Sequence, residues 1–212
     1  MSFPAPPISL EKGPDGLELR MRGDRPGQGV RAALEAVSTV GHPLTKLLRG
    51  CPGPVVDATA GLGGDTAVLA SMGRRVLAIE RSQVLIRLLD EAHQRIPDPE
   101  LQIRIQVLAG DALELLPQLP EEFKTPAAVI LDPMYPARRK RSALPPKSMQ
   151  ALRMLHSEGG DHGPEDLLPA AFAAGPQRVV LKRPPEAPLS SERAPTFSVT
   201  TKLVRWDAWE LG

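Results

Sequence analysis

The clearest chemical signal in the chain is the segment Asp132-Pro133-Met134-Tyr135-Pro136, which directly follows the apolar run 127–131. An exocyclic base amine is a poor nucleophile because its lone pair is delocalised into the ring. Hydrogen bonds from its N–H groups to the Asp132 carboxylate and the Pro133 carbonyl would localise that lone pair and aim it at a methyl group. Proline stiffens the turn, and Tyr135 offers a face on which an extruded base can stack. We therefore predict amino-methyl transfer, with Asp132, Pro133 and Tyr135 as the catalytic residues.

A second signal is the stretch VVDATAGLGGD at residues 55–65, in which an apolar run ends in Asp57 and Asp65 opens an expected helix. A strand, a glycine loop and a helix form the first half of a nucleotide-binding unit. A dinucleotide loop would place a pyrophosphate at the helix start, but Asp65 stands there and Thr66 replaces the last glycine of the motif. S-adenosylmethionine has no phosphate, and its sulfonium and ammonium groups favour nearby carboxylates. The stretch thus favours S-adenosylmethionine over NAD; the alternative is a structural turn whose Asp65 complements the helix start.

Carboxylates also follow the other expected strands. Glu80 ends the run 75–80, where a carboxylate accepts hydrogen bonds from ribose hydroxyls, and Asp111 is placed for the adenine amino group. A cluster of acids at one sheet edge is unfavourable unless a cation or a hydroxyl-rich ligand lies among them. Each acid by itself could instead be a solvated loop residue. The cofactor contacts predicted from these residues are Asp57, Gly61, Gly63, Asp65, Glu80 and Asp111.

Basic residues gather after the Asp-Pro turn. Between Pro133 and Ser157 there are six of them and no acid, and Lys182-Arg183 follows the last apolar run, at the same expected sheet edge. A cationic rim beside an amine-methylating site indicates a phosphate backbone as the partner. The alternative is a solvated basic loop. The RNA-binding residues predicted here are Arg138, Arg139, Lys140, Arg141, Lys147, Lys182 and Arg183.

Composition sets the outer limits of the interpretation. The 212 residues carry a net charge of +1, so overall charge does not argue for or against nucleic acid. Cys51 has no partner for a disulfide or a metal site, and the four histidines show no ligand spacing, so no metal is expected. The N-terminus has no signal-peptide pattern and no run is long enough to cross a bilayer. We expect a cytoplasmic protein without membrane contact.

The periodicity predicts strands that alternate with helices, which gives a doubly wound α/β sheet. Residues 1–16 are expected to be irregular. Residues 1–50 form an N-terminal extension and residues 51–212 a Rossmann-like domain that is mostly parallel with an antiparallel C-terminal strand. The expected strands are 16–22, 55–57, 75–80, 101–108, 127–131, 178–181, 196–203 and 205–211, and the expected helices are 30–40, 42–49, 65–72, 83–95, 112–116, 147–156 and 164–173.

Taken together, several segments resemble a known family. They are DATAGLGGD, the pair Glu80-Arg81, LDPMYP, the segment 140–144 and VVLKRP. Over about residues 55 to 205 the chain is similar to the small-subunit (16S) ribosomal RNA guanine-N2 methyltransferases of the J class. Two positions depart from the usual family pattern: Gly64 stands where arginine is frequent, and Asp111 where a small hydroxyl residue is frequent.

The resemblance implies the fold of class I SAM-dependent methyltransferases and methylation of a guanine amino group in 16S ribosomal RNA. It adds Gly64, Arg81, Gly110 and Asp132 to the expected cofactor contacts. The expected partner is ribosomal RNA or the small ribosomal subunit, and the protein is expected to be a monomer. Two alternatives stay open: a methyltransferase for another amine in DNA, protein or a small molecule, and a non-catalytic RNA- or ribosome-binding protein of the same fold.

Overall fold

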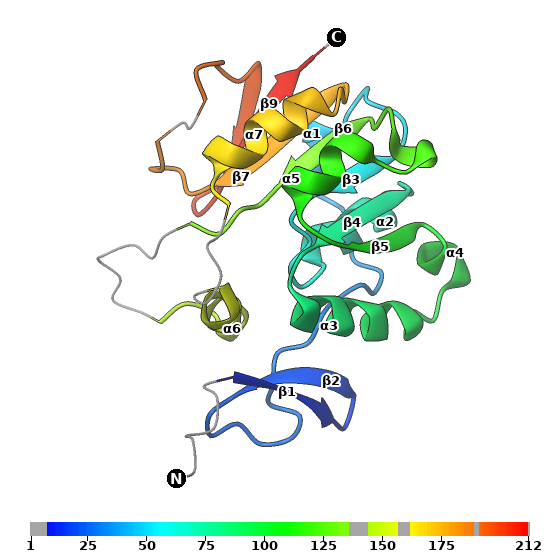
Figure 1. Cartoon of the computed structure of the whole chain (residues 1–212), viewed down its shortest axis with the longest axis vertical. Coiled ribbons are helices and arrows are strands. Elements are labelled where there is room, and N and C mark those ends of the chain that lie inside the picture. Colours follow the sequence, from blue (N-terminus) through cyan, green and yellow to red (C-terminus); the bar gives the residue numbers. More distant parts are fainter. Residues whose placement is uncertain (1–7, 136–143, 157–161, 189–190, 212) are drawn as a thin grey trace.

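A computed structural model describes residues 8–135, 144–156, 162–188 and 191–211. In this part of the chain the strands form an N-terminal hairpin and a larger seven-stranded sheet (Figure 1). The hairpin strands are β1 (Ile8–Gly13) and β2 (Gly16–Met21). The larger sheet consists of β3 (Val55–Asp57), β4 (Val76–Glu80), β5 (Ile105–Ala109), β6 (Ala128–Leu131), β7 (Arg178–Arg183), β8 (Phe197–Thr200) and β9 (Arg205–Glu210).

The strand order in the larger sheet is β5-β4-β3-β6-β7-β9-β8. The first five of these strands are parallel, and β9 runs antiparallel to both β7 and β8. The predicted Rossmann-like class, mostly parallel with an antiparallel C-terminal strand, is therefore confirmed. The order reverses at β3, so the ends of β3, β4 and β6 flank the switch point at which ligands bind in such sheets.

Helices cover both faces of the sheet (Figure 1). They are α1 (Pro43–Leu47), α2 (Gly64–Ser71), α3 (Gln83–Gln94), α4 (Pro99–Gln102), α5 (Ala112–Leu115), α6 (Lys147–His156) and α7 (Pro164–Ala173), with short 3-10 turns η1 (Leu116–Gln118) and η2 (Glu121–Phe123). Alternate strand residues face opposite layers: Ala128 and Ile130 of β6 pack with α1, α2 and α3, whereas Val129 and Leu131 pack with α5 and α7. Both faces of the central strands are therefore apolar, as parallel strands require.

Helix α3 begins where the sequence predicts. The Ser82 hydroxyl accepts a hydrogen bond from the Leu85 amide at 3.5 Å and caps the helix. Leu85, Leu88 and Leu89 lie on one side of the helix and are buried. Burial of a leucine of this kind contributes about 1.5–3 kcal/mol, so the apolar stripe holds α3 against the sheet.

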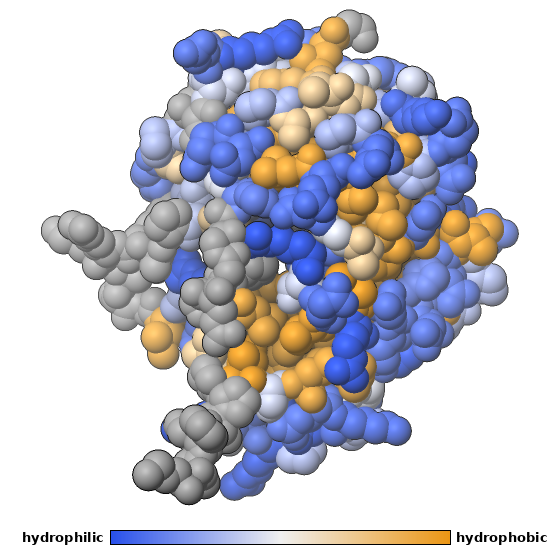
Figure 2. Space-filling model, in the orientation of Figure 1, coloured by the Kyte–Doolittle hydropathy of each residue, from blue (hydrophilic) through white to orange (hydrophobic). Residues whose placement is uncertain are grey.

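The N-terminal region differs from the prediction because residues 8–13, expected to be irregular, form β1 and pair antiparallel with β2. The hairpin lies beyond α3, at the end of the molecule opposite the C-terminus (Figure 1). Its buried Glu18 carboxylate accepts hydrogen bonds from Arg20 Nε and from the amides of Gly27 and Gly29. These contacts organise the loop after β2. Apolar residues gather on the surface where the hairpin, α3 and α6 approach one another (Figure 2).

One predicted helix, at residues 30–40, is wrong, and one predicted strand begins later than expected. Residues 31–42 form no helix, because tertiary contacts outweigh the weak helical spacing: Leu34 is fully buried, and the Ala33 amide donates to the Leu62 carbonyl at 2.9 Å. The third parallel strand begins at Ile105 rather than at Leu101. Residues 99–102 form α4 instead, with Asp98 as the N-cap.

Candidate active site

The parallel strands bring the predicted carboxylates to one edge of the sheet. Asp57 ends β3 and Glu80 ends β4, whereas Asp132 directly follows β6. The strands are in register, with Asp57 opposite Ala78 of β4 and Ile130 of β6. The expectation that these acids follow neighbouring parallel strands is confirmed.

The glycine loop between β3 and α2 is held by the end of β4. One Glu80 oxygen accepts a hydrogen bond from the Gly61 amide at 2.9 Å, and the other accepts one from the Ser82 amide at 2.8 Å. Gly63 is left-handed (φ +84°), and a Cβ there would lie 2.5 Å from a methyl carbon of Leu34. Glycine is thus required at this position by backbone conformation and by close packing.

Asp57 is the most deeply buried acid of the site. Its side chain accepts hydrogen bonds from the Thr66 hydroxyl at 2.6 Å and from the Thr59 amide at 3.3 Å. Burial, reinforced by the nearby Asp65 carboxylate, raises its pKa from 3.8 to about 7. At neutral pH this carboxyl is therefore partly protonated, and a cation placed beside it would favour the charged form.

Lys182 of β7 joins two of the predicted cofactor acids. Its Nζ lies 3.0 Å from Asp65 Oδ2 and 2.8 Å from Asp132 Oδ2. It also lies 4.9 Å from the ring centroid of Trp206, which is a cation–π contact. Burial opposes the charge of this side chain, but Asp132 and Asp65 raise the pKa of Lys182 above its ordinary value. Lys182 therefore belongs to the acidic site, and its role as an RNA contact stays a prediction.

His42 lies close to the same cluster. Its ring stands edge-on to the Trp206 ring at a centroid distance of 6.2 Å, and its Nδ1 accepts a hydrogen bond from the Leu44 amide at the start of α1. Burial lowers the pKa of His42, although the nearby Asp65 opposes this shift. The imidazole is therefore neutral at pH 7 and does not supply a second positive charge.

Asp111 is engaged by a residue that the sequence did not single out as functional. His162, just before α7, places its Nε2 2.6 Å from Asp111 Oδ2, and Asp111 Oδ1 caps α5 through the Leu113 amide. Burial by itself would raise the pKa of Asp111, but the contact with His162 holds it below its ordinary value. Asp111, which was predicted to contact the adenine amine, is thus already paired with His162 from the α6–α7 connection.

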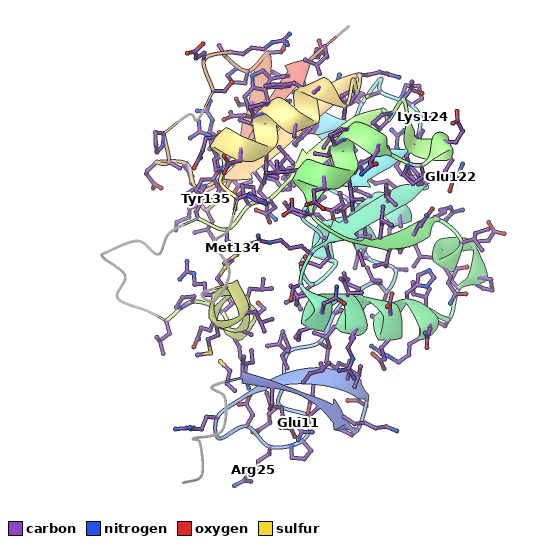
Figure 3. All side chains as sticks on the ribbon, in the orientation of Figure 1. Glu11, Arg25, Glu122, Lys124, Met134 and Tyr135 are labelled. Carbon is purple, nitrogen blue, oxygen red and sulfur yellow. The ribbon has the colours of Figure 1, made fainter. Side chains whose placement is uncertain are left out.

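The segment after β6 is tied to the glycine loop through its backbone. The Asp132 amide donates a hydrogen bond of 2.6 Å to the Thr59 hydroxyl. Figure 3 shows Met134 and Tyr135 on this segment, between the end of the sheet and α6. The Tyr135 hydroxyl is buried and has no hydrogen-bond partner among the described residues, and burial raises the pKa of Tyr135. The segment that holds the three predicted catalytic residues therefore begins beside the glycine loop, at Asp132.

The predicted basic rim is only partly described. Arg138, Arg139, Lys140 and Arg141 lie outside the described residues. Lys147 bonds to Asp24 Oδ1 at 2.6 Å and to the Gln28 carbonyl, so it ties α6 to the loop after β2. Arg183 is buried and pairs with the fully buried Asp207 at 2.6 Å. The charge of Arg183 is therefore already paired inside the sheet, and its role as an RNA contact stays a prediction.

The charges of the site fit S-adenosylmethionine. Asp65 and Asp132 contact one described ammonium group, that of Lys182, and Asp57 lies close enough to both acids to feel their charge. This excess of carboxylate suits a ligand that carries sulfonium and ammonium cations. A Cβ on Gly64 would meet nothing within 4 Å, so the loop leaves open space at the start of α2. Among the described residues no three His, Cys, Asp or Glu side chains converge on a possible metal site.

Sequence reasoning missed the residues that support these acids. Thr59, Thr66, His162 and Trp206 make their contacts across loops, and no local spacing identifies them. Lys182 was noticed as a basic residue after a strand, but its partner Asp65 lies 117 positions earlier in the chain. The only available signal was the placement of both residues at the carboxyl edge of the same predicted sheet.

Known proteins are similar to this chain in sequence and in fold. A family model described as "Putative SAM-dependent methyltransferase" matches residues 43–210. Ribosomal RNA small subunit methyltransferase J of Magnetococcus marinus is 36% identical over 222 residues, which cover 97% of this chain and 85% of the relative. The protein of that name from Aeromonas salmonicida is 42% identical over 160 residues, and the match covers 73% of this chain and 62% of the relative's length. The crystal structure of a SAM-dependent methyltransferase from Neisseria gonorrhoeae is similar at a TM-score of 0.70 and 27% identity, covering 99% of this chain and 84% of that one. In the described part of the chain no helix is long and apolar enough to cross a membrane.

Proposed function

The chain belongs to the family of SAM-dependent methyltransferases that includes the ribosomal RNA small subunit methyltransferases J, and we propose that it methylates the exocyclic N2 amine of a guanine in 16S ribosomal RNA. The observation that carries this proposal is the position of Asp132-Pro133-Met134-Tyr135. The turn follows a central parallel strand at the switch point, and its first amide bonds to the glycine loop. An acceptor for an amine and a loop for a methyl donor are thereby neighbours.

Three residues of the chain have separate roles in the proposed reaction. Asp132 and the Pro133 carbonyl accept hydrogen bonds from the guanine amine, and Tyr135 stacks on the extruded base. S-adenosylmethionine, when bound, supplies a methyl group activated by its sulfonium charge. After transfer, the amine proton passes to Asp132 or to water. Much of the rate comes from positioning rather than from a strong base.

The methyl donor is held by the loop and the strand ends. The acids offer negative charge to its cationic groups, and Glu80 remains the proposed partner of the ribose hydroxyls. The proposed cofactor contacts are Asp57, Gly61, Gly63, Gly64, Asp65, Glu80, Arg81, Gly110, Asp111 and Asp132. The basic segment Arg138–Arg141 is the proposed RNA contact, and the partner is ribosomal RNA or the small ribosomal subunit, bound by a monomer.

The division into an N-terminal extension (1–50) and a catalytic domain (51–212) is part of the same proposal. The family match begins at residue 43, close to this boundary. The N-terminal hairpin contacts α3 and α6, so the extension lies beside the elements that flank the site. Deletion of residues 1–50 would also remove Leu34 from its place against Gly63, and the two parts are therefore best tested in the full chain.

The test uses methyl-labelled S-adenosylmethionine and small ribosomal subunits from cells that lack the gene. After the reaction the RNA is digested and the labelled nucleosides are identified, with an Asp132→Asn variant as the matched control. Label in N2-methylguanosine with the wild type, and none with the variant, supports the proposal. Donor binding without label in any RNA would redirect the search to other amines. If the donor did not bind, the glycine loop would be a structural turn and the proposal would fail.

A further inference from the structure

Lys182 occupies a fixed position between two carboxylates. Its Nζ contacts Asp132 Oδ2 at 2.8 Å and Asp65 Oδ2 at 3.0 Å, and the Trp206 ring lies 4.9 Å away. An ammonium group has three N–H donors. The two carboxylates and the Trp206 ring provide one neighbour for each of these donors. The side chain is 24% exposed, so a phosphate backbone could reach it only by displacing these contacts.

Among the described residues, Lys182 is the one cation in contact with Asp132. The other groups that face Lys182 are an acid and a neutral imidazole. From α2 it faces Asp65, from the segment after β6 it faces Asp132, and from the start of α1 it faces His42. Partial burial and the charge of Asp65 both favour the protonated form of Asp132, whose side chain is 39% exposed. His42 is kept neutral by burial. Tyr135 also feels the charges of Asp132, Arg183 and Asp207, and the last two form a buried ion pair with each other.

We propose that Lys182 is a positioning residue for methyl transfer, which holds the Asp132 carboxylate charged and aimed at the substrate amine against repulsion from Asp65. The inference rests on the proposed function of Asp132. Lys182 binds Oδ2, and the amine donates its N–H to Oδ1. A protonated Asp132 would offer a donor where the amine needs an acceptor, so loss of the lysine would remove the acceptor rather than the binding site.

The direct test is the pH profile of methyl transfer by three variants. In Lys182→Met, the pH below which activity is lost (the acid limb of the profile) should rise by about one to three pH units. This is the usual effect of removing an opposite charge from beside a carboxylate. Activity should therefore fall most at the acid end of the profile and recover towards wild type as the pH rises. Lys182→Arg keeps the charge and should keep the position of the limb. Lys202→Met, an exposed lysine on the β8–β9 turn, is the matched control and should change nothing.

Two other roles predict different results, and either one would overturn the inference. If Lys182 contacts RNA, Lys182→Met raises the KM for RNA and weakens the salt dependence of RNA binding. The pH at which activity falls on the acid side then stays unchanged. If Lys182 only supports the fold, the variant loses activity by the same factor at every pH and melts at a lower temperature. Binding of S-adenosylhomocysteine, measured by calorimetry, shows in each case whether the cofactor site is intact.

A measurement without any substrate separates this inference from the proposed function. Carboxyl carbons of aspartate are labelled with ¹³C and titrated by NMR, and the Asp132 signal is assigned by its absence in Asp132→Asn. The titration of Asp132 should move upward in Lys182→Met and stay in place in Lys202→Met. An unmoved titration would refute the action of Lys182 on Asp132 even if RNA is methylated. A shifted titration in a protein that methylates no RNA would leave this action standing and place the failure in the proposed function.

Discussion

The burial of Asp57 predicts an unusual dependence of stability on pH. The pKa of this carboxyl rises from 3.8 to about 7 on folding, mainly because burial disfavours the charged form. The folded chain therefore binds the proton more tightly than the unfolded chain does. The resulting stabilisation is fully present below pH 3.8, declines as the pH rises, and is lost once the pH passes about 7. A shift of this size corresponds to about 4 kcal/mol in the free energy of unfolding.

The variant Asp57→Asn tests this reasoning because it removes the charge and keeps the shape. Its side-chain oxygen can still accept from the Thr59 amide, and its amide can donate to the Thr66 hydroxyl in place of the bond that Asp57 accepts. We expect the stability of the variant, relative to wild type, to increase by about 3 kcal/mol between pH 5 and pH 8. Urea unfolding followed by circular dichroism at several pH values measures this difference. Asp90→Asn, at an exposed position of α3, is the control and should show no such trend.

The same carboxyl links stability to the methyl donor. A cation bound beside Asp57 favours its charged form, so S-adenosylmethionine should stabilise the wild type more than Asp57→Asn at pH 8. Thermal unfolding with and without the donor provides the comparison. If the stability difference between the two proteins did not change between pH 5 and pH 8, the burial argument would be refuted. If the donor stabilised both proteins equally, Asp57 would have no electrostatic part in the cofactor site.

Substitutions at three further positions test separate parts of the site. Asp132→Asn should lower methyl transfer by about 10²–10⁴-fold and leave donor affinity within a few-fold of wild type; retained activity would remove Asp132 from the mechanism. Tyr135→Phe should bind RNA about as well as wild type because the hydroxyl has no partner among the described residues. Tyr135→Ala should weaken RNA binding by about 1–3 kcal/mol through lost stacking. Equal loss in both variants would contradict a stacking role. Arg183→Met should cost about 1–3 kcal/mol in urea unfolding, because it removes one of the two arginines that pair with the buried Asp207 and leaves Arg205 at 2.7 Å. A variant of unchanged stability with weakened RNA affinity would support the predicted RNA contact.

The main features of the fold could be predicted from local sequence. A run that ends in Asp57 and opens into glycines specifies a strand, a tight loop and a helix, since these backbone conformations depend on near neighbours. Ser82 similarly marks the start of α3 through a cap that spans three residues. The position of Asp132 after an apolar strand was enough to place it at the carboxyl edge of the sheet. The sequence by itself therefore determined the sheet, the glycine loop and the candidate catalytic turn.

What these residues contact depended on the tertiary structure. Lys182 and Asp65 are separated by 117 positions, and Lys147 and Asp24 by 123, so no local pattern shows that each pair meets. Segment 30–40 has a helical pattern but forms no helix, because burial of Leu34 against the glycine loop contributes more than weak helical propensity. Charge alone likewise could not separate a basic residue that faces RNA from one that neutralises a buried acid. That distinction requires knowing which side chains share a low-dielectric interior, and only the folded chain decides it.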